Sequence, residues 1–273
     1  PEGESLLDTP LPSAVLAGVT LERWCEALRA SRVVDSQQPE QGSCPLVLVG
    51  QRLYLRRYWQ HERQVVSILH QRLQQPLAVA EDLPARLDAL FAGSQQNPDW
   101  QRIACALAAR GRFSIITGGP GTGKTTTVVR LLALLQTPAV EAGKPLRIRL
   151  AAPTGKAAAR LTESIGRQVG ALPVDPAVQA AIPTEVSTLH RLLGSLPDSR
   201  HFRHHAGNPL ALDVLVVDEA SMIDLEMMAN VLAALPPQAR LVLLGDKDQL
   251  ASVEAGAVLG DLCRRADAGC YSP

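Results

Sequence analysis

The chain has 273 residues, with 27 Lys and Arg, 27 Asp and Glu, and six His, so its formal net charge at neutral pH is zero. This balance excludes a basic field over the whole surface that would attract nucleic acid or acidic membranes. A content of 46% hydrophobic residues is enough to form a buried core, and the length predicts one large or two modest domains. Lysine is rare, and three of the four lysines, Lys124, Lys156 and Lys247, fall within the motifs described below.

The five cysteines are odd in number, scattered and never spaced C-x-x-C, which argues against a disulfide framework and against a zinc cluster. We therefore expect a reducing, cytoplasmic environment. No apolar run approaches the roughly 20 residues that a membrane span needs, and the pattern of a secretory signal peptide is absent from the sequence. Because the first residue is Pro1, we expect the chain to be a piece of a longer polypeptide.

The first 96 residues carry the patterns of a small α/β domain. A helical period begins at Thr20, two β-prone runs around Gly50 predict a hairpin over residues 45–55, and apolar residues at helical spacing predict helices over 65–73 and from Asp82 to Phe91. No catalytic constellation is visible here. The aromatic residues Trp24, Tyr54, Tyr58 and Trp59 fit a core or a partner-binding face, and burial statistics favour the core.

A polar break at residues 94–98 marks the predicted domain boundary, between residues 96 and 97. Asn97 is the expected N-cap of the next helix, with Pro98 at its first position. Gln101 lies in the first turn of that helix. A primary amide can pair in bidentate fashion with the N6 and N7 edge of adenine. Adenine recognition by Gln101 and a solvated helix glutamine are both compatible with the sequence.

Residues 118–125 form the pattern G-x-x-x-x-G-K-T between a β-prone run, residues 113–117, and a helical period. In such a loop, backbone N–H groups at a helix N-terminus surround phosphate oxygens. Lys124 is expected to reach the β- and γ-phosphates, and the Thr125 hydroxyl to bind Mg²⁺. The predicted nucleotide contacts here are Gly118, Gly119, Pro120, Gly121, Thr122, Gly123, Lys124, Thr125 and Thr126.

Two later apolar strands end in polar residues, as expected where ligands sit at the carboxyl ends of parallel strands. The strand over 212–217 ends at Asp218 and Glu219, and the strand over 240–245 precedes Asp246 and Gln249. We expect Asp218 to hold Mg²⁺ through water and Glu219 to orient or deprotonate the attacking water. Gln249 would sense the γ-phosphate, and Asp246 would support the water shell of the metal. The alternative, that the acid pair only caps the next helix, is disfavoured by the matching glycine loop.

Two further segments combine a strand end, polar residues and the start of a helix, which is a combination that binds anions. A backbone phosphate of a polynucleotide is a suitable guest, although a capped helix with an exposed lysine explains the first segment equally well. The residues concerned are Pro153, Thr154 and Lys156 in the first segment, and Thr188 and His190 in the second.

Together these segments resemble the RecD-type superfamily 1B DNA helicases, the alpha subunits of exodeoxyribonuclease V. The resemblance is carried by GGPGTGKTTT (118–127), AAPTGKAAARL (151–161), STLHRLLG (187–194), VDEASMID (217–224) and GDKDQLASVEAG (245–256), and it extends to RLYLRRYW (52–59).

The resemblance implies an ATP- and Mg²⁺-dependent motor that moves 5′ to 3′ on single-stranded DNA, in a heterotrimer with RecB and RecC. It assigns Lys124 and Thr125 to motif I, Asp218 and Glu219 to motif II, and Gln249 to motif III. It also makes Gln101 the adenine-reading glutamine and places the two strand-end segments on the DNA track. The N-terminal region would dock on RecC.

The expected fold is therefore a small α/β partner-docking domain, residues 1–96, followed by a RecA-like P-loop ATPase domain, residues 97–273, with a parallel sheet flanked by helices. The family's second RecA-like domain, with the arginine that completes the ATP site, is expected to lie beyond residue 273, so this chain alone should turn ATP over slowly or not at all. Two alternatives are a nucleotide-binding scaffold without turnover and a P-loop ATPase of AAA+ or transporter type. The transporter signature Leu-Ser-Gly-Gly-Gln does not occur.

Overall fold

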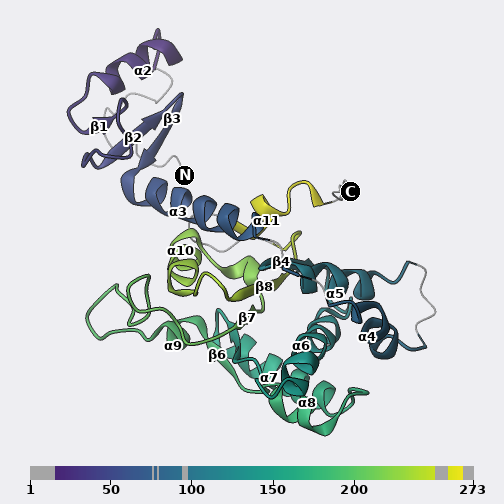
Figure 1. The fold of residues 1–273 in the computed structure, drawn as a ribbon. Helices are drawn as coiled ribbons and strands as arrows, with labels where there is room; N and C mark the ends of the chain where they lie inside the picture. Colours follow the sequence, from purple (N-terminus) through teal and green to yellow (C-terminus); the bar gives the residue numbers. More distant parts are fainter. Residues whose placement is uncertain (1–15, 76, 79, 94–97, 250–257, 267–273) are drawn as a thin grey trace, which may run out of the picture. The chain divides into compact units, whose positions relative to one another are not determined.

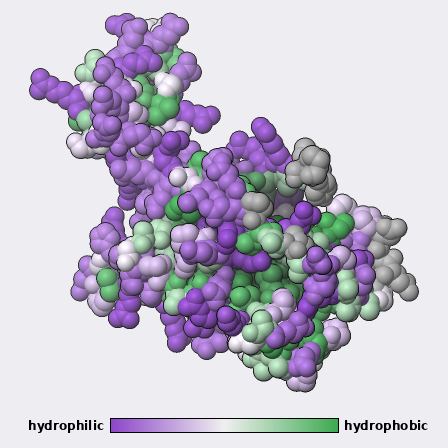
Figure 2. Space-filling model, in the orientation of Figure 1, coloured by the Kyte–Doolittle hydropathy of each residue, from purple (hydrophilic) through white to green (hydrophobic). Residues whose placement is uncertain are grey.

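The structure is a computed structural model that describes residues 16–75, 77–78, 80–93, 98–249 and 258–266. The chain divides into two compact units, residues 1–61 and residues 62–273, whose elements are labelled in Figure 1. Hydrophilic residues cover most of the face seen in Figure 2, with hydrophobic side chains in smaller groups between them. None of the helices in the described part of the chain has both the length and the apolar surface that a membrane crossing requires.

The first unit contains α2 (Leu21–Arg29), β1 (Val34–Asp35), β2 (Leu46–Val49), β3 (Arg52–Leu55) and the start of α3 (Arg56–Leu73). Thr20 caps α2, since its side chain accepts a hydrogen bond from the Arg23 N–H. The predicted hairpin is confirmed: β2 and β3 pair antiparallel, and Gly50 adopts a φ of 61° in the turn. Arg56 forms an ion pair with Asp35 and fastens the hairpin to β1.

The second unit is built on a five-stranded sheet with the order β4-β8-β7-β5-β6. Every pairing is parallel. Parallel sheets are buried on both faces, which explains why these strands are almost continuously apolar. The strands are β4 (Phe113–Thr117), β5 (Ile148–Ala152), β6 (Val186–Thr188), β7 (Val214–Val217) and β8 (Arg240–Gly245).

Helices cover both faces of this sheet, as predicted. Alternate residues of β7 enter different cores: Val214 and Val216 pack with one group of helices, and Leu215 and Val217 with the other. The first group is α4 (Leu83–Leu90), α5 (Trp100–Arg110), α6 (Lys124–Glu141), α7 (Gly155–Val169) and α8 (Pro176–Ala181). The second group is the C-terminal half of α3, α9 (Leu189–Leu193), α10 (Leu225–Ala234) and α11 (Val258–Leu262) (Figure 1).

The compact units divide between His61 and Glu62, whereas the sequence boundary lies between 96 and 97. Residues 62–93 pack with the parallel sheet: Val65 and Leu69 join the core on one face, and Leu87 and Phe91 join the core on the other. A helical period indicates that a segment has an apolar face, but not which sheet that face will cover.

Helix α5 begins two residues later than expected. Its N-cap is Asp99, whose carboxylate accepts a hydrogen bond from the Arg102 N–H at 3.0 Å. Pro98 precedes the cap rather than occupying the first helical position, and Asn97 lies outside the described residues. Asp at this position satisfies an N–H group of the first turn as well as Asn would, so local pattern alone did not separate the two.

Several helical segments were not anticipated, among them the part of α3 before residue 65. Helix α6 continues through Pro138 to Glu141, and α8 occupies part of the connection 171–185. Pro138 lies in the last turn of α6, where the helix continues although proline donates no backbone hydrogen bond. Asp175 and Pro176 form the N-cap and first position of α8, where a helix tolerates proline.

Candidate functional site

The glycine loop joins β4 to α6 at the carboxyl edge of the sheet. Gly121 and Gly123 adopt φ values of 76° and 82°, in the left-handed region that favours glycine. A Cβ on Gly123 would also lie 2.3 Å from Nε2 of Gln101, and one on Gly118 would lie 2.6 Å from Oγ1 of Thr122. Backbone conformation therefore favours glycine at residues 121 and 123, and a Cβ at Gly118 or Gly123 would displace a neighbouring side chain.

Lys124, the first residue of α6, folds its side chain back over this loop. Its Nζ donates hydrogen bonds to the carbonyl oxygens of Gly118 at 2.6 Å and Gly119 at 3.0 Å. The Thr122 hydroxyl donates to the same Gly119 carbonyl at 2.8 Å. The loop thus holds one ammonium group beside a helix N-terminus, an arrangement in which phosphate oxygens can replace the carbonyls.

A cavity of about 500 Å³ opens beside the loop. Its wall combines residues of the glycine loop with Trp100 and Gln101 of α5. Thr125 and Thr126 lie half-buried in the first turn of α6, and Pro120 is exposed at the tip of the loop. A space of this size suits a small ligand, with a phosphate-binding end and an aromatic and amide end.

Asp218 and Glu219 follow β7 at the same edge of the sheet. The Asp218 N–H donates to the Ala151 carbonyl oxygen at 2.9 Å. Burial raises the pKa of the Asp218 carboxyl above its usual value, and the negative charge of Glu219 raises it further. The hydrogen bond from the backbone N–H of Glu219 and the positive charge of Lys124 act in the opposite direction and lower this pKa. β4 leads to the loop that carries Lys124, β7 leads to Asp218, and β8 lies between these two strands. The ends of β4 and β7 are therefore two strand spacings of roughly 5 Å each apart.

Glu219 has a strained backbone. With φ 50° and ψ 40° it is one of two non-glycine residues of positive φ in the described part of the chain, the other being Asp198. A left-handed conformation costs about 1 kcal/mol or more in a residue with a Cβ. This residue is the N-cap of the short 3₁₀ helix Ala220–Met222.

The end of β8 connects the glycine loop to the segment after the acid pair. The Gly118 N–H donates to the Gly245 carbonyl oxygen at 3.2 Å, and the Lys247 N–H donates to Oγ1 of Thr117 at 3.2 Å. On the other side, the Ser221 hydroxyl donates to Oε1 of Gln249 at 3.0 Å. The structure thus brings Gln249 next to the acid pair, through Ser221, a contact that the sequence did not indicate.

The carboxylate of Asp246 binds the backbone of the turn that follows it: its Oδ1 accepts a hydrogen bond from the Asp248 N–H at 3.0 Å. It lies in the same strand-end loop as Gln249. Its expected support of a metal's water shell stays a prediction.

The expected DNA-contacting residues lie at the ends of β5 and β6, which are neighbours with Ala152 opposite Thr188. Thr154 caps α7 by accepting from the Ala157 N–H at 3.2 Å, and Thr188 caps α9 by accepting from the Arg191 N–H at 3.3 Å. All five strands are parallel, so this group shares the sheet edge with the glycine loop. The remaining members are Pro153, half-buried between β5 and α7, and Lys156 and His190, which are exposed.

Gln101 lies directly against the glycine loop. Its Nε2 donates to the Thr122 carbonyl oxygen at 3.3 Å, and its Oε1 accepts from Nη1 of Arg130 at 3.5 Å. This glutamine also lines the cavity beside the loop, and its expected recognition of adenine stays a prediction. Arg130 was not anticipated, because it lies within the apolar period of α6.

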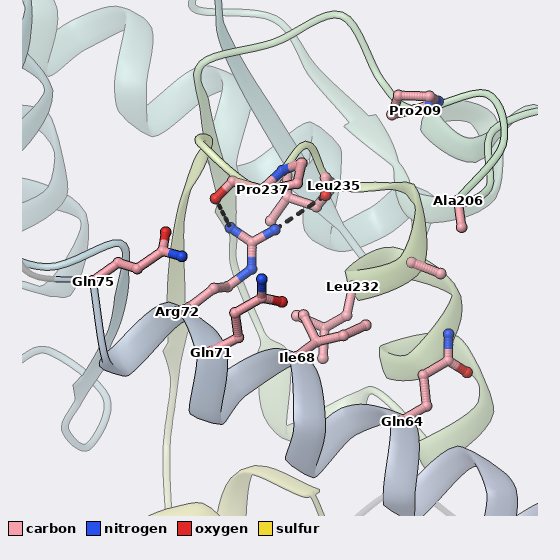
Figure 3. A pocket seen from close by; sticks show the side chains of 11 residues that line it. Gln64, Ile68, Gln71, Arg72, Gln75, Ala206, Pro209, Leu232, Leu235 and Pro237 are labelled. Carbon is pink, nitrogen blue, oxygen red and sulfur yellow. Dashed lines mark hydrogen bonds between the residues drawn. The ribbon is translucent and has the colours of Figure 1, made fainter.

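A second cavity, of about 220 Å³, lies elsewhere in the second unit and is shown in Figure 3. Gln64 and Gln71 of α3, and Gln75 just after this helix, line it together with Arg72. The Arg72 guanidinium donates to the carbonyl oxygens of Leu235, Pro236, Pro237 and Ala239, at the C-terminal end of α10. Burial, and to a lesser degree the charge of Arg112, lowers the pKa of Arg72 to about 10. This arginine caps a helix and has a structural role.

Comparison with known proteins adds two family matches. Residues 3–54 match the model described as RecBCD enzyme subunit RecD, N-terminal domain, and residues 101–255 match the model described as AAA domain. The second match covers more than half of the chain.

Individual relatives are also similar in sequence to this chain. The RecBCD enzyme subunit RecD of Haemophilus influenzae is 46% identical over 251 residues, covering 89% of this chain and 39% of that protein. The RecBCD enzyme subunit RecD of Mycolicibacterium smegmatis is 49% identical over 245 residues, covering 88% of this chain and 42% of that protein. The ATP-dependent RecD2 DNA helicase of Deinococcus radiodurans is 43% identical over 155 residues, covering 57% of this chain and 18% of that protein. The chain thus spans about two fifths of the length of these RecD relatives.

Proposed function

Because the chain belongs to the RecD family, as a RecD N-terminal domain followed by an AAA domain, we propose that it contains the ATP-hydrolysing site of an ATP-dependent DNA helicase subunit in a RecBCD-type complex. The observation that carries this proposal is the position of the glycine loop after β4 and of the acid pair after β7, at the same edge of the parallel sheet with only β8 between the two strands. A cation that binds phosphate and an acid that binds a metal are the two groups that phosphoryl transfer needs together.

In this proposal the triphosphate of ATP lies in the glycine loop. Lys124 exchanges the carbonyl oxygens of Gly118 and Gly119 for phosphate oxygens, while the N-terminus of α6 adds its partial positive charge. Thr125 and Asp218 would hold Mg²⁺. Their hydroxyl and carboxylate oxygens suit this ion, and the raised pKa of Asp218 indicates a buried carboxyl that a nearby cation would favour. When bound, Mg²⁺ supplies charge neutralisation to the phosphates.

Glu219 would position the attacking water, because its carboxylate follows Asp218 directly at the end of β7. Gln249 would sense the γ-phosphate and transmit the change to Ser221, with which it shares a hydrogen bond. Asp246 shapes the turn that carries Gln249. The chemistry consists of positioning and charge stabilisation around water attack on phosphorus.

Hydrolysis would be coupled to movement along single-stranded DNA in the 5′ to 3′ direction. The DNA-contacting group proposed here consists of Pro153, Thr154, Lys156, Thr188 and His190. Its location at the ends of β5 and β6, on the same sheet edge as the nucleotide site, supports this proposal. A change at the γ-phosphate can therefore reach the DNA track through β7 and β5, which are neighbouring strands.

The N-terminal region, which we placed at residues 1–96, would dock on the RecC subunit of a cytoplasmic complex that also contains RecB. Exposed apolar residues in the first unit support a protein partner: Leu21, Trp24 and Leu55 have exposed fractions of 54%, 48% and 51%. Trp59, by contrast, is 7% exposed and belongs to the core.

The alternative, a scaffold subunit that binds nucleotide without turnover, would not require Lys124, Asp218 and Glu219 together. The proposal is tested by DNA-stimulated ATP hydrolysis in the full-length complex with Lys124→Ala, and with Lys144→Ala as a control, since Lys144 is exposed and lies outside the motifs. We expect Lys124→Ala to abolish the turnover of this subunit and Lys144→Ala to leave it intact. Equal turnover in both variants would disprove the motor assignment.

A further inference from the structure

Three helices meet beside the glycine loop through a chain of contacts that starts at Phe91. This residue follows α4, and its ring is 6% exposed. The guanidinium carbon of Arg130, on α6, lies 4.5 Å from the centroid of this ring, which is the geometry of a cation–π contact. The same guanidinium donates from Nη1 to Oε1 of Gln101, on α5, at 3.5 Å. Phe91 therefore holds Arg130, and Arg130 contacts the amide of Gln101.

The amide of Gln101 has a defined orientation. Its oxygen faces the donor on Arg130, and its nitrogen donates to the Thr122 carbonyl oxygen at 3.3 Å. Rotating the amide by 180° would set its oxygen against the Thr122 carbonyl and its NH₂ group against a guanidinium. Both contacts would be repulsive, because a guanidinium has no acceptor and a carbonyl has no donor. Lateral space is also restricted, since the amide lies where a Cβ of Gly123 would be.

Resting on the nucleotide site proposed above, we propose that Arg130 is a positioning residue for base specificity. By fixing the amide of Gln101, it selects adenine over a base that carries an oxygen at position 6. An amide nitrogen has two hydrogens and an amide oxygen has two lone pairs, so each atom can still bind a base. Adenine offers a donor at N6 and an acceptor at N7, which match the amide oxygen and nitrogen. Hypoxanthine offers acceptors at O6 and N7, and the amide oxygen opposes O6.

The position of Arg130 supports a specific role. The residues around it on α6, Val128, Val129, Leu131 and Leu132, are buried and apolar, with exposed fractions of 1% or less. A leucine would continue this period, yet a cation occupies the position. Arginine combines a flat face that stacks on Phe91 with a donor that reaches Gln101, and lysine lacks the flat face.

The test compares binding of Mg-ADP and Mg-IDP to the full-length protein, because these nucleotides differ on the base only in the group at position 6 and in the hydrogen that hypoxanthine carries on N1. Inorganic tripolyphosphate serves as a competitor that reports on the phosphate end alone. The main variant is Arg130→Met, which removes the donor and keeps much of the length. Arg86→Met is the matched control: Arg86 pairs on the surface with Asp82 and Glu141, linking α4 to α6 without contacting Gln101.

We expect the wild-type protein to prefer ADP by at least about tenfold, since a bidentate pair discriminates well between bases. Arg130→Met should reduce this preference by about three- to tenfold, chiefly through weaker ADP binding, and leave tripolyphosphate competition unchanged. Arg86→Met should retain the wild-type preference. In a Gln101→Ala background, Arg130→Met should produce no further change in the ADP to IDP ratio.

An unchanged ratio in Arg130→Met would overturn the proposal, and so would an equal loss of ADP, IDP and tripolyphosphate binding, because Arg130 would then act on the phosphates or on the fold. Arg130→Lys is a second variant that retains the charge, and circular dichroism checks that it folds. Its ratio of ADP to IDP binding should be intermediate between those of the wild type and Arg130→Met. A wild-type ratio would count against the role of the planar guanidinium. If the wild-type protein bound neither nucleotide, the proposed ATP site would fail instead.

Discussion

The N–H of Gly118 donates a hydrogen bond to the carbonyl oxygen of Gly245 at 3.2 Å, so the first residue of the glycine loop is fastened to the end of β8. Since β8 lies between β4 and β7, Gly245 is the spacer between the lysine side and the acid side of the site. The site is therefore built on the ends of three neighbouring strands, β4, β8 and β7. Gly245, at the end of the middle strand, lies between the glycine loop and the acid pair.

Gly245→Ala tests this spacing. A Cβ at this position would lie 2.5 Å from Cδ2 of Leu259 and 3.2 Å from the Ser221 nitrogen. Leu259 can move, but the backbone at Ser221 cannot move without displacing the acid pair. We expect a loss of about 1–3 kcal/mol in the free energy of unfolding, measured by urea denaturation, together with reduced ATP hydrolysis.

Gly166→Ala is the matched control for this substitution. Gly166 lies inside α7, and its Cβ would meet no atom within 4 Å. Alanine there should stabilise the protein by about 0.5–1 kcal/mol through helix propensity. If both variants were equally stable, the crowding at Gly245 would have no energetic consequence.

The strained backbone of Glu219 predicts an unusual order of stability. Glu219→Gly and Glu219→Ala both remove the carboxylate, but only glycine adopts a φ of 50° without strain. Glu219→Gly should therefore be more stable than Glu219→Ala by about 1 kcal/mol, a difference that thermal unfolding can measure. Both variants should lack hydrolysis, and an alanine variant as stable as the glycine variant would argue that the residue is not strained.

Trp100 provides an optical test of the cavity. Its side chain is 60% exposed and lines the space beside the glycine loop. Binding of Mg-ADP should cover this face of the indole and change its fluorescence. Trp100→Phe should abolish the nucleotide-dependent change, whereas Trp59→Phe should preserve it, because Trp59 is buried in the first unit. A signal that survives Trp100→Phe would place the base elsewhere.

The ion pair of Arg147 with Asp213 predicts a pH dependence of stability. Hydrogen bonding from Arg147 lowers the pKa of Asp213, chiefly through the side chain, with Nε at 3.0 Å and Nη2 at 2.9 Å. A carboxyl whose pKa is lower in the folded state stabilises the protein above its unfolded pKa, and this stabilisation is lost as the pH falls through the folded pKa.

Urea denaturation of the wild type and of Asp213→Asn should therefore differ by up to about 1 kcal/mol near pH 7, with the difference shrinking below about pH 4. The size is modest because the pair is partly exposed, with exposed fractions of 61% and 37% for the two side chains. A difference that stays constant from pH 7 to pH 3 would show that the charge of Asp213 does not contribute.

The sequence predicted those parts of the site that are contiguous in the chain. The glycine loop needs specific residues at fixed spacing. The strand before Gly118 is β-prone and the strand before Asp218 is continuously apolar, so both were visible without the structure. The parallel sheet followed from the alternation of these strands with helices.

Contacts between elements distant in the sequence were not predictable in the same way. In the sequence, Arg130 is one residue of an otherwise apolar helical pattern. Only the fold shows that Phe91, which follows α4, and Gln101, on α5, contact it. The hydrogen bond of Ser221 to Gln249 depends on how β7 and β8 end together. The left-handed backbone of Glu219 leaves no trace in its residue type, because glutamate is not a residue that favours positive φ.

The central claim is that the triphosphate group of one ATP molecule lies between Lys124 and Asp218. A crystal structure of the full-length protein with Mg²⁺ and a non-hydrolysable ATP analogue tests it directly. We predict β- and γ-phosphate oxygens within hydrogen-bonding distance of Nζ of Lys124, with Mg²⁺ near the Thr125 hydroxyl and on the side of Asp218. Phosphates bound away from the glycine loop, or a metal with no connection to Asp218, would contradict the account.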